Sequence, residues 1–211
     1  MNYLAHVYLA EDSDDALVGN LLGDFVRGKV QDHDWPPAIA RGIRLHRRVD
    51  SFTDTHPIVQ RSKARLPAER RRVAGIVVDV AYDHFLALHW EHFSATPLPS
   101  FTQRVYRALE KHSTLWPARL AQMAPYMIND DWLYRYRRPD VAARVLDGIA
   151  RRLRRPEALL GSGVEMLDAY EGLRTDFFAF FPDLVDYAHR CREELAGAPT
   201  TNAASPHRRA S

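Results

Sequence analysis

The sequence offers few stabilising devices beyond a hydrophobic core. Cys191 is the single cysteine among 211 residues, which excludes an internal disulfide and a cysteine-rich zinc site. No apolar run approaches the roughly 20 residues that a membrane-spanning helix needs. The first residues, MNYLAHVYLAEDSDD, lack the basic start and the small-residue cleavage site of a secretory signal. We therefore expect a cytoplasmic protein without membrane insertion.

Motifs that define several common enzyme classes are also missing. The sequence has no glycine-rich phosphate loop, no H-E-x-x-H zinc motif, no C-x-x-C pair and no G-x-S-x-G elbow. Cys191 has no His–Asp grouping near it in the sequence, so a thiol nucleophile is not favoured. Strand-like alternation bounded by hairpin dipeptides is absent as well.

Helical patterning dominates the rest of the chain. The stretch SDDALVGNLLGDFVRG places Ser13 as an N-cap, followed by acidic residues in the first helical turn. Prolines occur where first helical turns would begin. With the chain length, this pattern predicts one all-α domain at residues 1–195, with roughly eight to ten helices. Residues 196–211 have no apolar period and are expected to be a disordered tail.

Positive charge is concentrated in one block of the sequence, although the net charge is only +2. Ten basic residues lie between Arg41 and Arg72, and only Asp50, Asp54 and Glu69 oppose them. Summed charge raises the local concentration of an oppositely charged ligand, so this block favours an acidic or phosphorylated partner. A solubilising surface is the alternative explanation for any single arginine.

The stretch VAGIVVDVAYDHFLALHW is apolar on nearly every side of a helical wheel, which is typical of a buried helix. Asp79 and Asp83 lie one turn apart on it. Buried carboxylates are paired, protonated or bound to metal, because isolated burial of their charge is very costly. An ion pair with arginines of another helix is one explanation. The adjacent His84 favours the other, a metal site.

The stretch RLHRRVDSFTD divides into an apolar face and a basic face. His46 and Asp50 lie one turn apart at the border between these faces, where a cleft normally opens. His46 could bind a metal while Asp50 binds it too, orients His46 or acts as a base. An ordinary surface pair one helical turn apart is the alternative.

The stretch GNLLGDFVRG places Asn20, Asp24 and Arg27 on one face of an expected helix. Gly19 and Gly23 form a small face that lets another helix or a ligand approach closely. Close helix packing with an Asp24–Arg27 pair explains the pattern equally well. Nearer the start of the sequence, His6 stands alone among apolar residues, and such a histidine is usually a satisfied core residue.

Together these motifs resemble the acyl carrier protein phosphodiesterases, a family related to the HD-type metal-dependent phosphohydrolases. The matching pieces run from Asn2 to about Leu184: NYLAH, GNLLGDFVRG, HRRVDSFTD, RRVAGIVVDVAYDHFLALHW, WLYRYR and FFAFFPDL. The resemblance implies an all-α, HD-like fold and a divalent metal, with Mn²⁺ or Mg²⁺ favoured. It also implies hydrolysis of the phosphodiester that joins 4′-phosphopantetheine to a serine of acyl carrier protein.

The resemblance carries over a set of site residues: Asp24, His46, Asp50, Asp79, Asp83 and His84. We expect metal ligation by His46, Asp79, Asp83 and His84, and catalytic roles for Asp24 and Asp50. Phosphate charge would be neutralised by Arg27, Arg47 and Arg48, and His6 and Asn20 are further candidates. The doublet Asp83-His84 reverses the His-Asp order of HD enzymes, so the ligands are expected in a permuted order. The Arg41–Arg72 block would dock the acidic carrier protein.

Two other functions are compatible with parts of the pattern. An HD-like phosphohydrolase acting on a nucleotide or another small phosphodiester would share the metal site without needing the broad basic surface. A non-enzymatic helical protein that binds nucleic acid would explain the basic block alone. The nucleic-acid-binding hypothesis leaves Asp79 and Asp83 unexplained, and the sequence has no groove-reading motif to support it. No nucleic-acid partner is therefore expected.

Overall fold

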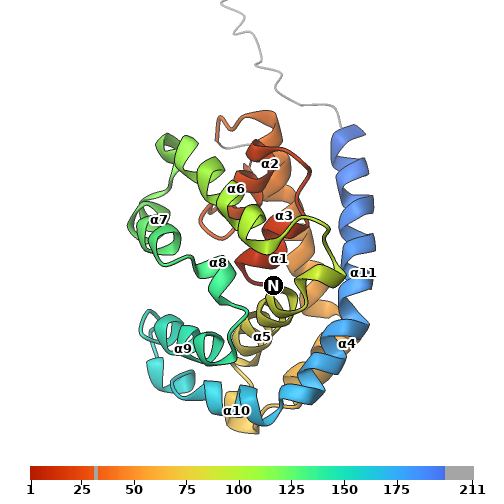
Figure 1. The fold of residues 1–211 in the computed structure, drawn as a ribbon, viewed down its shortest axis with the longest axis vertical. Coiled ribbons are helices and arrows are strands. Elements are labelled where there is room, and N and C mark those ends of the chain that lie inside the picture. Colours follow the sequence, from red (N-terminus) through yellow and green to blue (C-terminus); the bar gives the residue numbers. More distant parts are fainter. Residues whose placement is uncertain (31–32, 198–211) are drawn as a thin grey trace, which may run out of the picture.

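The computed structural model describes residues 1–30 and 33–197. These residues form eleven α-helices joined by loops and short 3₁₀ turns, and they contain no β-strand. The predicted all-α class is therefore confirmed (Figure 1). From residue 198 onward, the expected tail lies outside the described residues. Among the described residues, no helix is both long enough and apolar enough to cross a bilayer.

The helices exceed the expected number because several are shorter than two turns. They are α1 (Tyr3–Tyr8), α2 (Asp14–Leu22), α3 (Pro37–Thr55), α4 (Pro57–Ala64), α5 (Ala74–Leu88), α6 (Leu98–Lys111), α7 (Ala118–Asn129), α8 (Trp132–Arg135), α9 (Pro139–Ala150), α10 (Ser162–Asp168) and α11 (Tyr170–Gly197). The prolines that open α3, α4 and α9 occupy the first helical turn, as expected. Ser13 caps α2 by accepting a hydrogen bond from the backbone N–H of Ala16.

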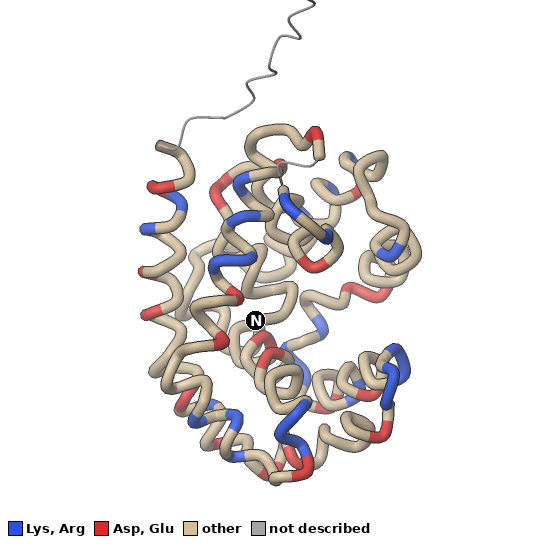
Figure 2. The backbone as a smooth tube through the Cα atoms, turned by 180° about the vertical axis from the view of Figure 1, so that it is seen from behind, with Lys and Arg blue, Asp and Glu red and all other residues tan. Residues whose placement is uncertain are grey.

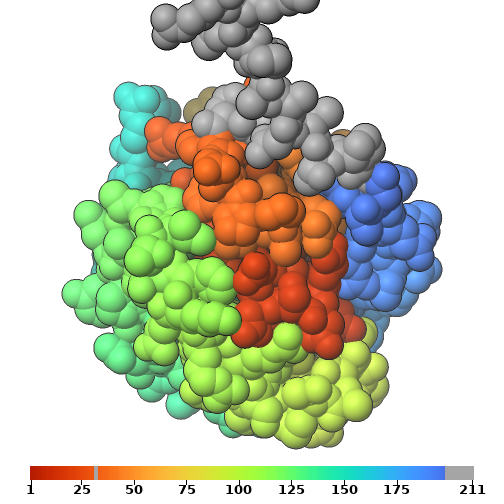
Figure 3. All heavy atoms as spheres, turned by 90° about the horizontal axis from the view of Figure 1, so that it is seen from above, coloured from red at the N-terminus to blue at the C-terminus, as the bar shows by residue number. Residues whose placement is uncertain are grey.

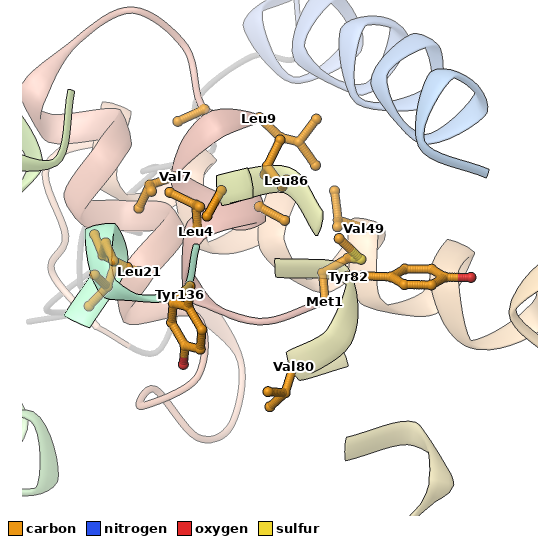
Figure 4. Packing of buried hydrophobic residues seen from close by; sticks show 14 of the residues in the cluster. Met1, Leu4, Val7, Leu9, Leu21, Val49, Val80, Tyr82, Leu86 and Tyr136 are labelled. Carbon is orange, nitrogen blue, oxygen red and sulfur yellow. The ribbon is translucent and has the colours of Figure 1, made fainter. Parts of the chain in front are cut away.

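Helix α5 lies in the centre of the molecule, packed against α1, α4, α9, α10 and α11. Between Ala74 and Ala87, its only positions that are not buried are Gly75, Ile76 and Asp79. The prediction of a buried helix is thus confirmed. The surrounding core includes Met1, whose side chain is buried with residues of α1, α3 and α5 (Figure 4). In Figure 3 the N-terminal segment (red) forms part of the surface beside α6 (green).

Helices α2 and α3 pack closely because glycines face each other across the contact. A Cβ atom on Gly19 would lie 2.4 Å from the carbonyl oxygen of Ile39, and one on Gly42 would lie 2.8 Å from that of Ala16. The expected close approach at the small face is confirmed. However, α2 ends at Leu22, so Asp24 and Arg27 lie in the following loop. The expected helical face of Asn20, Asp24 and Arg27 is therefore wrong.

A buried carboxylate joins α4 to α11. The side chain of Asp176 is fully buried and lies 2.7 Å from Arg61 Nη2 and 2.6 Å from Arg65 Nε. The hydroxyl of Ser62 donates a third hydrogen bond to it, at 2.8 Å. Burial opposes ionisation, but the hydrogen bonds from Arg65, Ser62 and Arg61 outweigh it and hold the pKa of Asp176 below its ordinary value.

Asp176→Asn is expected to lower the free energy of unfolding by about 2–3 kcal/mol, because charge-assisted hydrogen bonds are lost at a buried site. Since the folded pKa is depressed, this contribution is fully present above about pH 4 and is lost as the pH falls through the folded value. Urea unfolding at pH 7 and at pH 3 measures both effects. Asp186→Asn, at an exposed position of the same helix, is the control. Equal stability of the two variants at pH 7 would contradict the assignment.

Candidate active site

Titratable groups from four parts of the fold and the N-terminus meet at one place beside α1. They are the amino group of Met1, His6 on α1, Asp24 in the loop after α2, His46 and Asp50 on α3, and Asp79 on α5. Figure 2 shows acidic residues on neighbouring helices close to the N-terminus. Segments far apart in the sequence therefore build one polar cluster.

Two histidine rings form the floor of this cluster. The rings of His6 and His46 are stacked with their centroids 3.7 Å apart, and both residues are buried. His6 Nε2 lies 3.0 Å from Asp50 Oδ1, and His46 Nε2 lies 3.1 Å from Asp50 Oδ2. Each carboxylate oxygen of Asp50 therefore faces one imidazole.

A hydrogen bond to the backbone fixes the orientation of the His46 ring. Its Nδ1 donates a hydrogen bond to the backbone carbonyl of Asn20 at 2.7 Å. That bond sets the tautomer, so in the neutral ring the lone pair lies on Nε2, which faces Asp50 and, at 3.6 Å, Asp24. Gly23 makes room for the ring, because a Cβ atom there would lie 2.1 Å from His46 Cγ. Asn20 thus contributes its backbone to the site, while its side-chain amide donates to Ala16.

The donor atoms of this cluster fit a divalent metal. One nitrogen each from His6 and His46 and one carboxylate oxygen of Asp50 all lie within 4.8 Å of one another. Both ring nitrogens of His6 are buried, and neither makes a hydrogen bond among the described residues, although Nε2 is close to Asp50. Imidazole nitrogen and carboxylate oxygen are the usual ligands of first-row divalent ions.

The carboxylates form the side of the cluster that is exposed to solvent. The side chains of Asp24, Asp50 and Asp79 are 40%, 41% and 35% exposed, whereas those of the two histidines are almost fully buried. A metal ion or a substrate phosphate can therefore reach the cluster from the carboxylate side.

The pKa values of the two neighbouring imidazoles are shifted in opposite directions. Burial lowers the pKa of His46, but the carboxylates of Asp24 and Asp50 outweigh burial and raise it to about 9. Burial and the neighbouring His46 lower the pKa of His6 to about 4. Although burial opposes it, the adjacent imidazoles of His46 and His6 hold the pKa of Asp50 far below its ordinary value. Asp50 is therefore ionised and His6 neutral at pH 7.

The cation that pairs with Asp79 is the chain's own amino group. The nitrogen of Met1 lies 3.0 Å from Asp79 Oδ1 and 3.8 Å from Asp50 Oδ1. Burial lowers the pKa of this amino group, but Asp79 and Asp50 outweigh burial and raise it to about 10. Asp79 therefore pairs with the terminal amine and not with an arginine of another helix, the partner that its burial had suggested.

Asp83 performs a structural task away from the histidine pair. Its Oδ2 accepts a hydrogen bond from the backbone N–H of Leu4 at 2.7 Å, and its Oδ1 accepts one from Ala5 at 3.1 Å. These are free N–H groups at the start of α1, where Asn2 provides no side-chain cap. Asp83 therefore anchors the helix that carries His6.

His84 also has protein partners for both ring nitrogens. Its Nδ1 donates to the carbonyl of Tyr136 at 2.7 Å, and its Nε2 accepts from the hydroxyl of Tyr170 at 2.7 Å. The structure therefore does not bring His84 or Asp83 into the histidine cluster. The expectation that the Asp83-His84 doublet supplies two metal ligands stays a prediction, and these protein partners do not favour it.

The three arginines expected to bind phosphate are placed differently from one another. Arg47 donates to the carbonyl oxygens of Gly28 and Val26 and so holds the loop that carries Asp24. Arg48 pairs with Glu194 on α11. Arg27 is exposed in the loop after α2. The expectation that Arg47 and Arg48 face the phosphate stays a prediction, and it is not favoured because their guanidinium groups already have partners within the fold.

Comparison with known proteins identifies the family of the chain. A family model described as acyl carrier protein phosphodiesterase matches residues 1–184, which include every residue of the cluster. The chain belongs to this family. No solved structure gives a significant match, so the HD-like architecture stays a prediction.

Relatives bearing the name acyl carrier protein phosphodiesterase align along nearly their whole length. Those from Serratia proteamaculans and Yersinia pestis are each 41% identical over 189 residues, or 89% of this chain and 97% of the relative. One from Escherichia coli O45:K1 is 40% identical over 194 residues, or 90% of this chain and 98% of the relative. The family assignment therefore applies to the whole helical region that holds the cluster.

Gly23→Ala is expected to displace the His46 ring and weaken the binding of Mn²⁺ by about 10–100-fold, the usual effect of disturbing a group that orients a ligand. Crowding of a packed site should also lower the free energy of unfolding by about 1–3 kcal/mol. Isothermal titration and urea unfolding measure the two effects. Gly148→Ala is the control, because a Cβ atom there meets nothing within 4 Å. Unchanged Mn²⁺ affinity in folded Gly23→Ala protein would contradict the placement of His46.

Proposed function

We propose that the protein hydrolyses the phosphodiester between 4′-phosphopantetheine and the serine of holo-acyl carrier protein, which releases the apo-protein and free phosphopantetheine. The family names the substrate and the reaction class. The observation that carries the proposal is the solvent-open His6–His46–Asp50 group within the matched region. The proposal includes the cytoplasmic location expected from the sequence.

We further propose that His6, His46 and Asp50 hold a divalent metal. Two imidazoles favour Mn²⁺ over Mg²⁺, because Mg²⁺ prefers oxygen ligands and keeps most of its water. When bound, such an ion supplies Lewis-acid polarisation of a phosphoryl oxygen and lowers the pKa of water. The backbone carbonyl of Asn20 keeps His46 Nε2 directed at this place.

The two remaining carboxylates flank the metal-binding group and handle protons. Asp24 lies 3.6 Å from His46, so it is placed to orient the attacking water and take up its proton. Asp79 lies across the cluster beside Asp50 and forms an ion pair with the ammonium group of Met1, so this pair is the candidate to supply a proton to the leaving serine oxygen. Water adds to phosphorus, the bond from phosphorus to the serine oxygen breaks, and the serine hydroxyl is regenerated.

The reaction is tested by incubating the protein with holo-acyl carrier protein and Mn²⁺ and measuring the intact mass of the carrier protein. We expect loss of one phosphopantetheine, complete inhibition by EDTA and recovery when Mn²⁺ is added back. An unchanged carrier mass, in a sample that hydrolyses a nucleotide or another small phosphodiester, would instead support the alternative phosphohydrolase.

Ligand variants test which residues hold the metal. His6→Ala and Asp50→Asn are expected to abolish stoichiometric Mn²⁺ binding and to lower kcat by at least about 100-fold, since the ion supplies several kcal/mol of charge stabilisation. Asp83→Asn is the matched carboxylate-to-amide control. It should retain stoichiometric Mn²⁺ binding, with the affinity lowered by at most about 10–100-fold because Asp83 acts only by placing His6, while losing about 1–3 kcal/mol of stability, because buried N–H groups of α1 lose part of their acceptor.

Mn²⁺ titration followed by electron paramagnetic resonance, with urea unfolding in parallel, separates the two effects. The ligand assignment is wrong if folded Asp83→Asn protein no longer binds Mn²⁺ while Asp50→Asn protein still does.

A further inference from the structure

Six exposed arginines lie beside the proposed active site without an acidic partner among residues 1–30 and 33–197. Two precede α5 and four follow α9: Arg71, Arg72, Arg151, Arg152, Arg154 and Arg155. Both segments lie in the lower half of Figure 2, where they appear as blue stretches. Arg72, Arg154 and Arg155 line a cavity of about 580 Å³ together with Val73, Leu153 and Ala158.

Most of the basic block seen in the sequence is, by contrast, used inside the fold. The ion pairs are Arg41–Glu11, Arg48–Glu194, Arg61–Asp176, Arg65–Asp176, Lys63–Asp54 and Arg70–Glu165. Within the described part of the chain, only Arg44, Arg71 and Arg72 of that block neither pair with an acid nor bond to the backbone. The charge that this block leaves available to a partner is therefore reduced to these three arginines.

A strip of half-buried residues on α5 connects these arginines to the cluster. Arg72 and Val73 come directly before Ala74, the first residue of α5. Asp79 is five residues farther along, which is about 7.5 Å along the helix axis. The positions of α5 that are not buried over this distance are Gly75, Ile76 and Asp79. The strip thus runs from the arginine cavity to a carboxylate of the active site.

Lys63 borders the strip while its charge is paired with Asp54. A Cβ atom on Gly75 would lie 3.6 Å from Lys63 Cε. A negatively charged molecule seated here would meet the arginines first and the metal-binding group at the far end.

The arrangement fits an acidic protein better than a small anion. The six arginines come from two separate segments, and only three of them line the cavity, so the positive charge covers a surface. Unpaired like charges at such close range repel one another, and an acidic partner relieves that repulsion. Rim charges of this kind raise the rate of association and make it sensitive to salt.

We propose that Arg71, Arg72, Arg154 and Arg155 form the docking surface for the acidic carrier protein, whose modified serine then lies on the α5 strip next to Asp79. This inference rests on the proposed function, because it takes the carrier protein as the substrate. It assigns recognition to residues that are separate from the metal-binding group.

The test compares the wild type with an Arg72→Glu/Arg155→Glu double variant. Two quantities are measured: Kd for apo-acyl carrier protein, which needs no turnover, and KM and kcat for holo-acyl carrier protein. We expect Kd and KM to rise at least about tenfold with kcat within about twofold, and a weaker dependence of kcat/KM on salt. Turnover of bis(p-nitrophenyl) phosphate reports whether the metal site is intact.

Two single variants serve as references. Arg107→Glu makes the same charge change at an exposed position of α6 and should leave Kd and KM unchanged. Arg44→Glu tests the other basic surface, on α3, where Lys29, Arg44, Arg47 and Arg48 line a second cavity of about 330 Å³.

Several results would overturn the docking proposal. One is a double variant whose Kd and KM equal those of the wild type. Another is an equal loss of kcat/KM on the small diester and on the carrier protein. The third is a rise in Kd with Arg44→Glu that exceeds the rise in the double variant. Failure of the wild type to cleave holo-carrier protein would refute the proposed function. The docking surface would then still be judged from Kd.

Discussion

The contact of one carboxylate with two stacked imidazoles organises the rest of the site. Asp50 faces His6 with one oxygen and His46 with the other. Because the two rings are 3.7 Å apart, they cannot both be positively charged at low cost in free energy. The fold is arranged to hold this contact. Gly23 leaves room for the His46 ring, and the carbonyl of Asn20 orients it through a hydrogen bond. Asp83 anchors the first turn of α1 and thereby positions His6.

Sequence patterns could predict the elements but not the long-range contacts between them. The helical class, the burial of α5 and the Ser13 cap follow from periodicity and capping, which are local. The pairing of His46 with Asp50 was also accessible, because both residues lie on one helix. The surroundings of His6 and Asp83 could not be predicted, because they depend on contacts between α1 and distant elements. A helical wheel shows which face a residue occupies and does not identify what lies opposite it.

Predictions made from the charge of the sequence have the same limitation. The Arg41–Arg72 block indicated an acidic partner, but counting charges cannot separate arginines that neutralise acids inside the fold from those left for a ligand. Asp176, more than 100 residues away in sequence, occupies two of them. The arginines after α9 lie outside the block and gain significance only because α9 packs against α5. In the proposed arrangement, recognition and chemistry lie at opposite ends of one half-buried strip of α5.

The central claim is that His6, His46 and Asp50, rather than the Asp83-His84 doublet, hold the catalytic metal. Anomalous diffraction from crystals grown with Mn²⁺ tests it most directly. We predict a manganese peak about 2.0–2.4 Å from Nε2 of both histidines and from a carboxylate oxygen of Asp50. A manganese peak bound by Asp83 and His84, with none at the histidine pair, would contradict the account.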